Sequence, residues 1–271
     1  QAWVGHWPGG LAVATILSCG LFAAISGSSV ATAATIGTVA IPEMVSRGYD
    51  RRFVYGLLAA GGTLGILIPP SIPMIVFGFV AEESVIALFL AGIGPGLLLV
   101  GLFVGFSMIY ARFSGQYTQM PKSSWAERKK STVMALPSVA LAVLIVGGLY
   151  SGAFTPTEAS AVGFVTAILI TTFWLRRLTW PAFWEAVKES AVTTTAILII
   201  IAAAKTFGKA LALYRVPQDI SAFIAMNIDG PIIFILIVSL VLLVMGLVFE
   251  TLSMILIMTP VLLPAAMGLG F

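Results

Sequence analysis

The sequence predicts an all-α polytopic membrane protein with inverted repeats, two re-entrant helical hairpins and a broken transmembrane helix. Three observations support this prediction. Of the 271 residues, 59% are hydrophobic and 9% are charged, whereas a soluble domain has about 25% charged residues. One interrupted apolar segment occurs twice in outline, and most basic residues gather in a few stretches between apolar runs. Because the mean hydropathy is +1.08, we expect no soluble domain.

The first predicted element is a hairpin over residues 11–45. Its apolar arms are Leu11–Ile25 and Val30–Val45, the second ending at Pro42, and the polar run Ser26-Gly27-Ser28-Ser29 separates them. Each arm is shorter than the about 20 apolar residues that a full span needs. Hydrocarbon cannot satisfy the exposed backbone groups of such a tip, so we expect the tip to face protein, water or ions.

The next element is a broken helix over residues 53–79. It is long enough to span, but Gly61-Gly62, Gly65 and Pro69-Pro70 interrupt it. Proline lacks a backbone donor and restricts the residue before it, so a continuous helix is not expected here. The span Ile86–Ile109 completes a first half, residues 1–110, and residues 111–131 are expected to form a cytoplasmic loop.

The second half, residues 132–271, is expected to contain further spans and a second hairpin over residues 231–267. The spans are Thr132–Tyr150, Ala159–Leu175 and Ala191–Phe207, followed by a mixed, interfacial stretch, Ala210–Asp229. The hairpin arms are Pro231–Phe249 and Leu252–Met267, with Glu250-Thr251 at the tip. Because Gln1-Ala2-Trp3 is not a natural start and the chain stops directly after the second hairpin, we expect a fragment that lacks both ends.

The two hairpins are related by an offset of 222 residues. Four positions of the first copy correspond to the second: Val39, Pro42, Gly48 and Tyr49 fall on Val261, Pro264, Gly270 and Phe271. Paired interrupted segments in two halves of a membrane protein are the best sequence indication of a transporter's substrate and ion sites.

The charges fix the predicted topology. The trace places 11 of the 14 basic residues on one side and only Lys205, Lys209 and Arg215 on the other. The positive-inside rule assigns the first group to the cytoplasm. The first hairpin then enters from the cytoplasm and the second from outside, which is an inverted topology. Basic residues between apolar spans do not indicate nucleic-acid binding.

The first tip has the chemistry of a cation site. Ser26, Ser28 and Ser29 bring three hydroxyls and unpaired carbonyls to one place, and oxygen ligands suit a hard cation such as Na+. Alternatively, these serines only pack closely or bond back to helix carbonyls. The broken helix that follows favours the ion site. With a single cysteine and a single histidine in the chain, no transition metal and no cofactor are expected.

Two further candidates lie in the second half. Glu250 is the only acid inside a predicted apolar hairpin, and intramembrane acids indicate function by default. It could balance a cation, carry a proton or shape the substrate pocket, or it could be protonated and hydrogen-bonded at the tip. Thr155 and Thr157, beside Glu158, are either a helix cap or ligands of a second ion site.

Several motifs resemble one family, the large membrane subunit of TRAP (tripartite ATP-independent periplasmic, DctM-like) transporters. The resemblance covers essentially the whole chain, and its most specific part is SGSS followed some forty residues later by GILIPPS. The motifs are GGLA (Gly9–Ala12), LFAAISGSS (Leu21–Ser29), AAGGTLGILIPPSIPM (Ala59–Met74), AGIGPG (Ala91–Gly96), TPTEASAVG (Thr155–Gly163) and FET to Pro264.

The resemblance implies a secondary active transporter subunit in the bacterial inner membrane, with an elevator-type, ion-transporter-like fold. It implies sodium-coupled uptake of an organic acid, such as a C4-dicarboxylate or sialic acid. It also implies two partners in addition to the lipid bilayer, a small TRAP membrane subunit and a periplasmic substrate-binding protein. Na+ would be the coupling ion, with no other cofactor.

The resemblance also implies site residues, several acting through backbone carbonyls. The expected sodium-binding set is Ser26, Gly27, Ser28, Ser29, Gly65, Ile68 and Pro69. We expect the substrate cavity to involve Ser29, Pro70, Ser71, Glu250 and Thr251, and a second ion site to involve Thr155 and Thr157. The second-half counterpart of the broken helix would lie beyond Phe271, so the second sodium site is expected to be incomplete in this chain.

Three other functional classes differ in how well they fit the sequence. A binding-protein-independent sodium/carboxylate symporter of related fold would show the same features. An intramembrane enzyme is disfavoured, because the chain has one His, one Cys, no paired intramembrane aspartates and no Ser with a plausible base nearby. Broken helices argue against a purely structural or assembly subunit.

Overall fold

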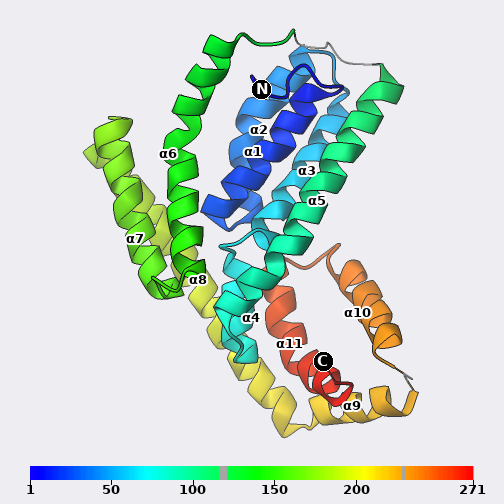
Figure 1. Ribbon diagram of the computed structural model, residues 1–271. Coiled ribbons are helices and arrows are strands. Elements are labelled where there is room, and N and C mark those ends of the chain that lie inside the picture. Colours follow the sequence, from blue (N-terminus) through cyan, green and yellow to red (C-terminus); the bar gives the residue numbers. More distant parts are fainter. Residues whose placement is uncertain (116–120, 228–229, 271) are drawn as a thin grey trace. The chain divides into compact units, whose positions relative to one another are not determined.

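The computed structural model describes residues 1–115, 121–227 and 230–270, and the regular elements within these ranges are helices (Figure 1). Three predicted features fall partly or wholly outside the described residues: Phe271, which the repeat aligns with Tyr49, part of the loop 111–131, and the end of the stretch Ala210–Asp229. The helices are α1 Gly10–Ser26, α2 Ser29–Ser46, α3 Arg51–Leu67, α4 Ile72–Ala81, α5 Val85–Ser114, α6 Trp125–Tyr150, α7 Pro156–Leu169, η1 Ile170–Trp174, α8 Trp180–Leu213, α9 Val216–Asn227, α10 Pro231–Met245 and α11 Thr251–Gly268.

The chain forms two compact units. The first contains residues 1–74 and 85–177, and the second contains residues 75–84 and 178–271. The chain therefore passes between the units three times, inside α4, directly before α5 and between η1 and α8. The predicted division into halves at residues 110 and 132 stays a prediction.

The first unit is built around α1, which packs against α2, α3, α5 and α6. Figure 1 shows α1, α2, α3 and α5 side by side. Ile16 and Cys19 of α1, Met44 of α2, and Val54 and Leu64 of α3 are completely buried in its core. Much of α1 is thus buried, although Leu17 and Leu21 are exposed. At 17 residues α1 is shorter than a full span of about 20, as expected for one arm of a hairpin.

The remaining helices of the first unit begin at strong capping signals. The Ser124 hydroxyl accepts from the amide of Glu127, whose carboxylate accepts from the Ser124 amide, and this capping box starts α6. Helix α7 packs on α6 and passes into the π-helical turn η1. Near the other end of α6, the Tyr150 hydroxyl donates to the Phe89 carbonyl of α5 at 3.1 Å.

The second unit contains the end of α4 with α8 to α11. Helix α11 packs on α8, α9 and α10 around Ile224, Phe234 and Ala265. The Lys205 ammonium of α8 lies 4.1 Å from the centre of the Phe79 ring of α4, a cation–π contact. The 34 residues of α8 extend about 50 Å, longer than a hydrocarbon core of about 30 Å.

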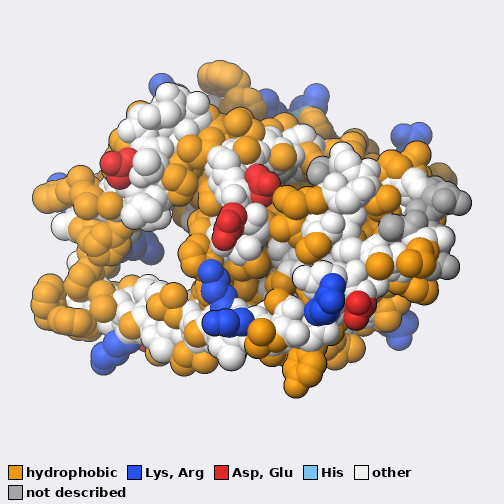
Figure 2. Space-filling model, turned by 90° about the horizontal axis from the view of Figure 1, so that it is seen from below, with side chains coloured by type: hydrophobic (Ala, Val, Ile, Leu, Met, Phe, Trp, Pro, Cys, Tyr) orange, Lys and Arg blue, Asp and Glu red, His pale blue; other side chains and the backbone are white. Residues whose placement is uncertain are grey.

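The helices have the lengths and surfaces of a polytopic membrane protein. Five helices in the described ranges are long and apolar enough to cross a membrane, or six if the bent pair α3 and α4 counts as one span. Large apolar side chains are widely exposed, and hydrophobic side chains cover much of the face in Figure 2. A soluble protein rarely exposes such extensive apolar surface, so this surface fits contact with lipid.

Most predicted helix bounds agree with the structure, but four details were wrong. Helix α2 continues through Pro42 to Ser46, because a proline removes only one backbone hydrogen bond of the helix. Helix α8 absorbs the start of the stretch predicted as interfacial, whose later part is the short helix α9. Both ends of the predicted loop 111–131 are helical. Gly61, Gly62 and Gly65 lie within continuous α3 and do not break it.

Candidate functional site

The first hairpin turns within two residues, Gly27 and Ser28. Gly27 ends α1 with φ of +60°, a left-handed conformation that glycine adopts without strain. Ser28 is extended, and its hydroxyl accepts from the Ala31 amide at 3.4 Å to cap α2. A Cβ atom on Gly27 would lie 2.8 Å from the Pro70 carbonyl oxygen. Both its conformation and its close approach to the broken helix therefore require glycine here.

The predicted break at Pro69-Pro70 is confirmed, because α3 ends at Leu67, α4 starts at Ile72, and the pair is bent by 43°. The break is attached to the tip: the Ile72 amide donates to the Gly27 carbonyl at 3.3 Å. The Ser71 hydroxyl, which is buried, donates to the Ile66 carbonyl at 2.6 Å. Ser71 thus stabilises the end of α3.

The glycines of α3 bring that helix onto the tip. A Cβ atom on Gly65 would lie 2.5 Å from the Ser28 carbonyl oxygen, and one on Gly62 would lie 3.1 Å from the Ser29 carbonyl oxygen. Small residues allow helix backbones to approach closely. The glycine pattern that suggested a break is therefore a packing surface: Gly62 and Gly65 face the SGSS segment, and Gly61 faces Cys19 of α1.

A cluster of hydroxyls lies at this contact. The Thr32 hydroxyl donates to the Ser28 carbonyl at 2.7 Å, and Thr32 and Ser26 hydroxyl oxygens lie 3.0 Å apart. The Ser28 amide donates to the Ser26 hydroxyl at 3.4 Å. Thr32 is completely buried. It was missed in the sequence, although its place four residues after Ser28 puts the two on one helix face.

The break adds further oxygen atoms. Within the described ranges, no hydrogen-bond donor reaches the carbonyl oxygens of Ile68, Pro69 or Pro70. Helix α5 closes over this segment, since a Cβ on its Gly92 would lie 2.9 Å from the Leu67 carbonyl oxygen. Free carbonyls and hydroxyls are the ligands that hard cations prefer. The described part of the chain has no group of three or more His, Cys, Asp or Glu residues able to hold a metal.

The structure thus brings together most of the residues predicted for the first site. Ser26 to Ser29 contact α3 and the break through Gly62, Gly65, Pro70 and Ile72. Ser71 was predicted to line a substrate cavity, but its hydroxyl bonds inward to the end of α3. The roles of all these residues in binding stay predictions.

Of the two threonines proposed for a second ion site, Thr155 forms the helix cap that was the alternative interpretation. The Thr155 hydroxyl accepts from the Glu158 amide at 3.3 Å and donates to the Glu158 carboxylate at 2.8 Å. The same carboxylate accepts from the Thr155 amide, which completes a capping box at α7. Thr157 is exposed. An ion role for the pair stays a prediction.

Glu250 and Thr251 belong to the second unit. Thr251 is the first residue of α11, and the Glu250 carboxylate caps that helix by accepting from Leu252 and Ser253 amides at 2.8 and 3.4 Å. Thr251 and Gly268, the ends of α11, lie 222 residues after Ser29 and Ser46, the ends of α2. Glu250 therefore has the position in its helix that Ser28 has in α2. Whether it faces a substrate cavity stays a prediction.

Comparison with known proteins gives a consistent result. Residues 1–271 match the family model described as the DctM component of tripartite ATP-independent periplasmic transporters. The chain is 43% identical over 270 residues to the C4-dicarboxylate TRAP transporter large permease protein DctM of Pseudomonas aeruginosa.

The names of two further relatives mention other solutes. The ectoine/5-hydroxyectoine TRAP transporter large permease protein UehC of Ruegeria pomeroyi is 35% identical over 270 residues, and the sialic acid TRAP transporter large permease protein SiaM of Vibrio cholerae is 36% identical over 267 residues. These alignments cover 98 to 100% of this chain and 62 to 63% of the relatives' lengths.

Proposed function

The chain belongs to the family of DctM components of TRAP transporters, and we propose that it is part of a sodium-coupled permease that imports a small organic acid. The family consists of transporter components and not of enzymes. The observation that carries the sodium proposal is the contact of the Ser26–Ser29 tip with the Gly65–Ser71 segment. There, clustered hydroxyls adjoin a helix break with free carbonyls.

We propose that Na+ binds between the tip and the break. Ser26 and Thr32 hydroxyls, with carbonyls of the break, would supply its ligands. The Ser28 carbonyl already accepts from the Thr32 amide and hydroxyl, so we assign Ser28 mainly to holding the tip. Bound Na+ would fix α3 against the hairpin, and this would couple ion binding to the arrangement of the substrate cavity.

The proposed substrate is an organic acid, since relatives' names include a C4-dicarboxylate and sialic acid. No arginine lies at either tip, so hydroxyls and the positive ends of α2 and α11 would bind its carboxylate. The proposed partners are a small membrane subunit and a periplasmic binding protein, as the family's tripartite description suggests. We place the complex in the bacterial inner membrane.

The proposal includes an inverted arrangement of the two hairpins and an elevator-type movement. The charge distribution supports a first hairpin that enters from the cytoplasm. Single cysteines at Arg51 and Ala126 should then be labelled from the same side of the membrane by an impermeant thiol reagent. Labelling from opposite sides would contradict this topology.

The function is tested with the full-length complex in proteoliposomes. Uptake of a panel of organic acids is measured with an inward gradient of Na+ or of choline, in the presence of the periplasmic binding protein. We expect accumulation of at least one acid with Na+ and the binding protein present. Accumulation without Na+ would reject the coupling, and accumulation without the binding protein would favour the independent symporter.

A further inference from the structure

We propose that a groove between α3 and α5 of the first unit holds one acyl chain of an anionic phospholipid, whose headgroup is bound by Arg52. The groove has a volume of about 700 Å³, within the 300–1,000 Å³ common for ligand pockets. It starts at Asp50 and Arg52 and continues along Gly56 and Ala60. This site lies at the outer ends of α3 and α5, apart from the tip and break.

The walls of the groove suit an acyl chain. Phe53 stacks in parallel on Tyr110 with ring centres 4.0 Å apart, and Phe106 packs obliquely on both rings. These rings form a flat aromatic wall. On the α3 side, Gly56 leaves the groove open, because no described atom lies within 4 Å of a Cβ placed there. From Arg52 to Ala60 the helix rises about 12 Å, close to the hydrocarbon depth of one leaflet, about 15 Å.

The charged end of the groove suits an anionic headgroup. Asp50 is engaged locally, since its carboxylate accepts from the Phe53 amide at 3.1 Å and caps α3. In contrast, neither Arg51 nor Arg52 forms an ion pair or side-chain hydrogen bond within the described residues. Cations at the positive end of a helix do not stabilise it. These two arginines are therefore available to an external anion.

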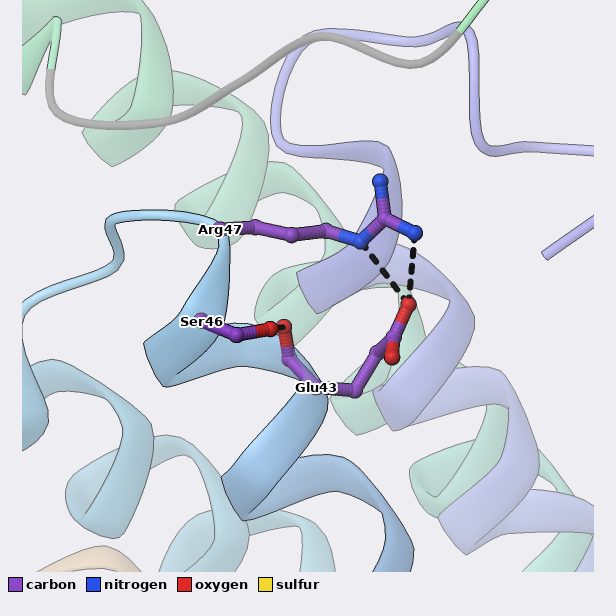
Figure 3. Close-up of polar contacts among 3 residues, drawn as sticks. All are labelled: Glu43, Ser46 and Arg47. Carbon is purple, nitrogen blue, oxygen red and sulfur yellow. Dashed lines mark hydrogen bonds and ion pairs between the residues drawn. The ribbon is translucent and has the colours of Figure 1, made fainter.

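A neighbouring arginine shows the opposite situation. Arg47, at the end of α2, is paired with Glu43 at 2.7 Å, and the Ser46 hydroxyl donates to the Glu43 carbonyl (Figure 3). The charge of Arg47 is thus compensated within the protein, whereas that of Arg52 is not. Both lie on the side that the charge distribution assigns to the cytoplasm, where the leaflet surface is negative.

The proposal is tested by measuring lipid that stays bound to the full-length permease. The protein is placed in phosphatidylcholine nanodiscs containing phosphatidylglycerol with the same acyl chains, extracted, and analysed by native mass spectrometry. We expect phosphatidylglycerol to be retained preferentially. Arg52→Ala should weaken this preference about fivefold, the effect of one basic residue at an anionic surface. Arg47→Ala removes one charge nearby and should leave the preference unchanged.

The acyl chain is tested separately. Gly56→Leu places a side chain in the groove at a position where no described atom lies within 4 Å of the added Cβ. It should lower retention of both lipids about tenfold, equivalent to displacing two methylene groups. Gly101→Leu, on α5 in an equally open position but outside the groove, is the matched control and should retain lipid. Unfolding temperatures close to wild type confirm that both variants are folded.

Three results would overturn the proposal. One is wild-type retention by Gly56→Leu. Another is release of the bound lipid by excess inorganic phosphate, which would indicate a site for free anions. The third concerns a photo-crosslinker at Leu102, on the rim of the groove, which should capture phospholipid. Capture of a protein helix there would show that the groove is a subunit or intrachain interface.

Discussion

The two helix-capping tips of this chain, at Ser28 and at Glu250, have the same local role and different surroundings. Each is the N-cap of an 18-residue helix, and the two helices are offset by 222 residues. The Ser28 tip is held by contacts with α3 and the break. The exposed Glu250 side chain accepts hydrogen bonds only from the first turn of its own helix within the described residues.

This difference indicates where each tip obtains its rigidity. A cap alone contributes about 1 kcal/mol, whereas close packing of backbones makes even one added methyl group costly. Substitutions at the first tip should therefore change stability and ion binding strongly. Substitutions at the second tip should leave stability nearly unchanged, so their effect is measured by transport.

The largest effect is expected from Gly65→Val. Its Cβ would lie 2.5 Å from the Ser28 carbonyl oxygen and 2.9 Å from the Thr32 hydroxyl, so α3 must move off the tip, at a cost of about 1–3 kcal/mol. Thermal unfolding of the full-length permease should show this loss, and sodium-driven uptake should be abolished. Gly101→Val, with open space around it, is the control. A wild-type transport rate in Gly65→Val would disprove the tight contact.

Gly27→Ala should have the next largest effect. It combines a left-handed conformation with a contact of 2.8 Å to the Pro70 carbonyl oxygen. Gly48→Ala has a φ of +86° and no described atom within 4 Å, so it measures the conformational cost alone, about 1–2 kcal/mol. Each substitution lowers the free energy of unfolding. The extra loss in Gly27→Ala over that in Gly48→Ala measures how much the contact between the tip and the break stabilises the protein. Equal losses would mean that this contact contributes nothing.

Thr32→Val should destabilise moderately and weaken sodium dependence. It keeps the shape of the side chain but removes the hydroxyl that bonds to the Ser28 carbonyl and lies beside Ser26, a net loss of about 1 kcal/mol. Thr15→Val removes another buried hydroxyl, which donates to the Leu11 carbonyl at 2.9 Å, and serves as control. The sodium concentration giving half-maximal uptake should rise only in Thr32→Val. An equal rise in both variants would argue against Thr32 as a ligand.

The smallest effect on stability is expected from Glu250→Gln. The amide oxygen can still cap α11, so only the attraction between a carboxylate and the helix end is lost, about 0.3–1 kcal/mol. If Glu250 contributes charge to coupling, uptake falls while expression and assembly persist. Glu158→Gln, at the capped start of α7, controls for loss of an acidic cap. Unchanged uptake in Glu250→Gln would leave the carboxylate with a capping role alone.

Much of the helical framework could be predicted from the sequence. Apolar run lengths, the SGSS interruption and Pro69-Pro70 indicated α1 to α4 within a few residues, because missing backbone donors and polar tips act locally. The distribution of basic residues also predicted which side of the membrane each hairpin enters from, and this topology stays a prediction.

The contacts of the site could not be predicted in the same way. A glycine in an apolar helix indicates either a break or a close approach, and only the partner decides between them. For Gly65 that partner is Ser28, which is distant in the sequence. Thr32 was overlooked because a threonine within an apolar helix commonly bonds to its own backbone. Its relation to Ser26 depends on the turn at Gly27.

The central claim, that the contact between the Ser26–Ser29 tip and the broken helix binds Na+, is tested most directly by ligand-dependent stability. The thermal unfolding midpoint of the full-length permease is measured over a series of NaCl concentrations, with choline chloride keeping the ionic strength constant. Binding to the folded state alone raises the midpoint with ligand concentration. We predict a rise with Na+ in the wild type, a weaker rise in Thr32→Val and none in Gly65→Val. A wild-type midpoint that is the same in Na+ and choline would contradict the claim.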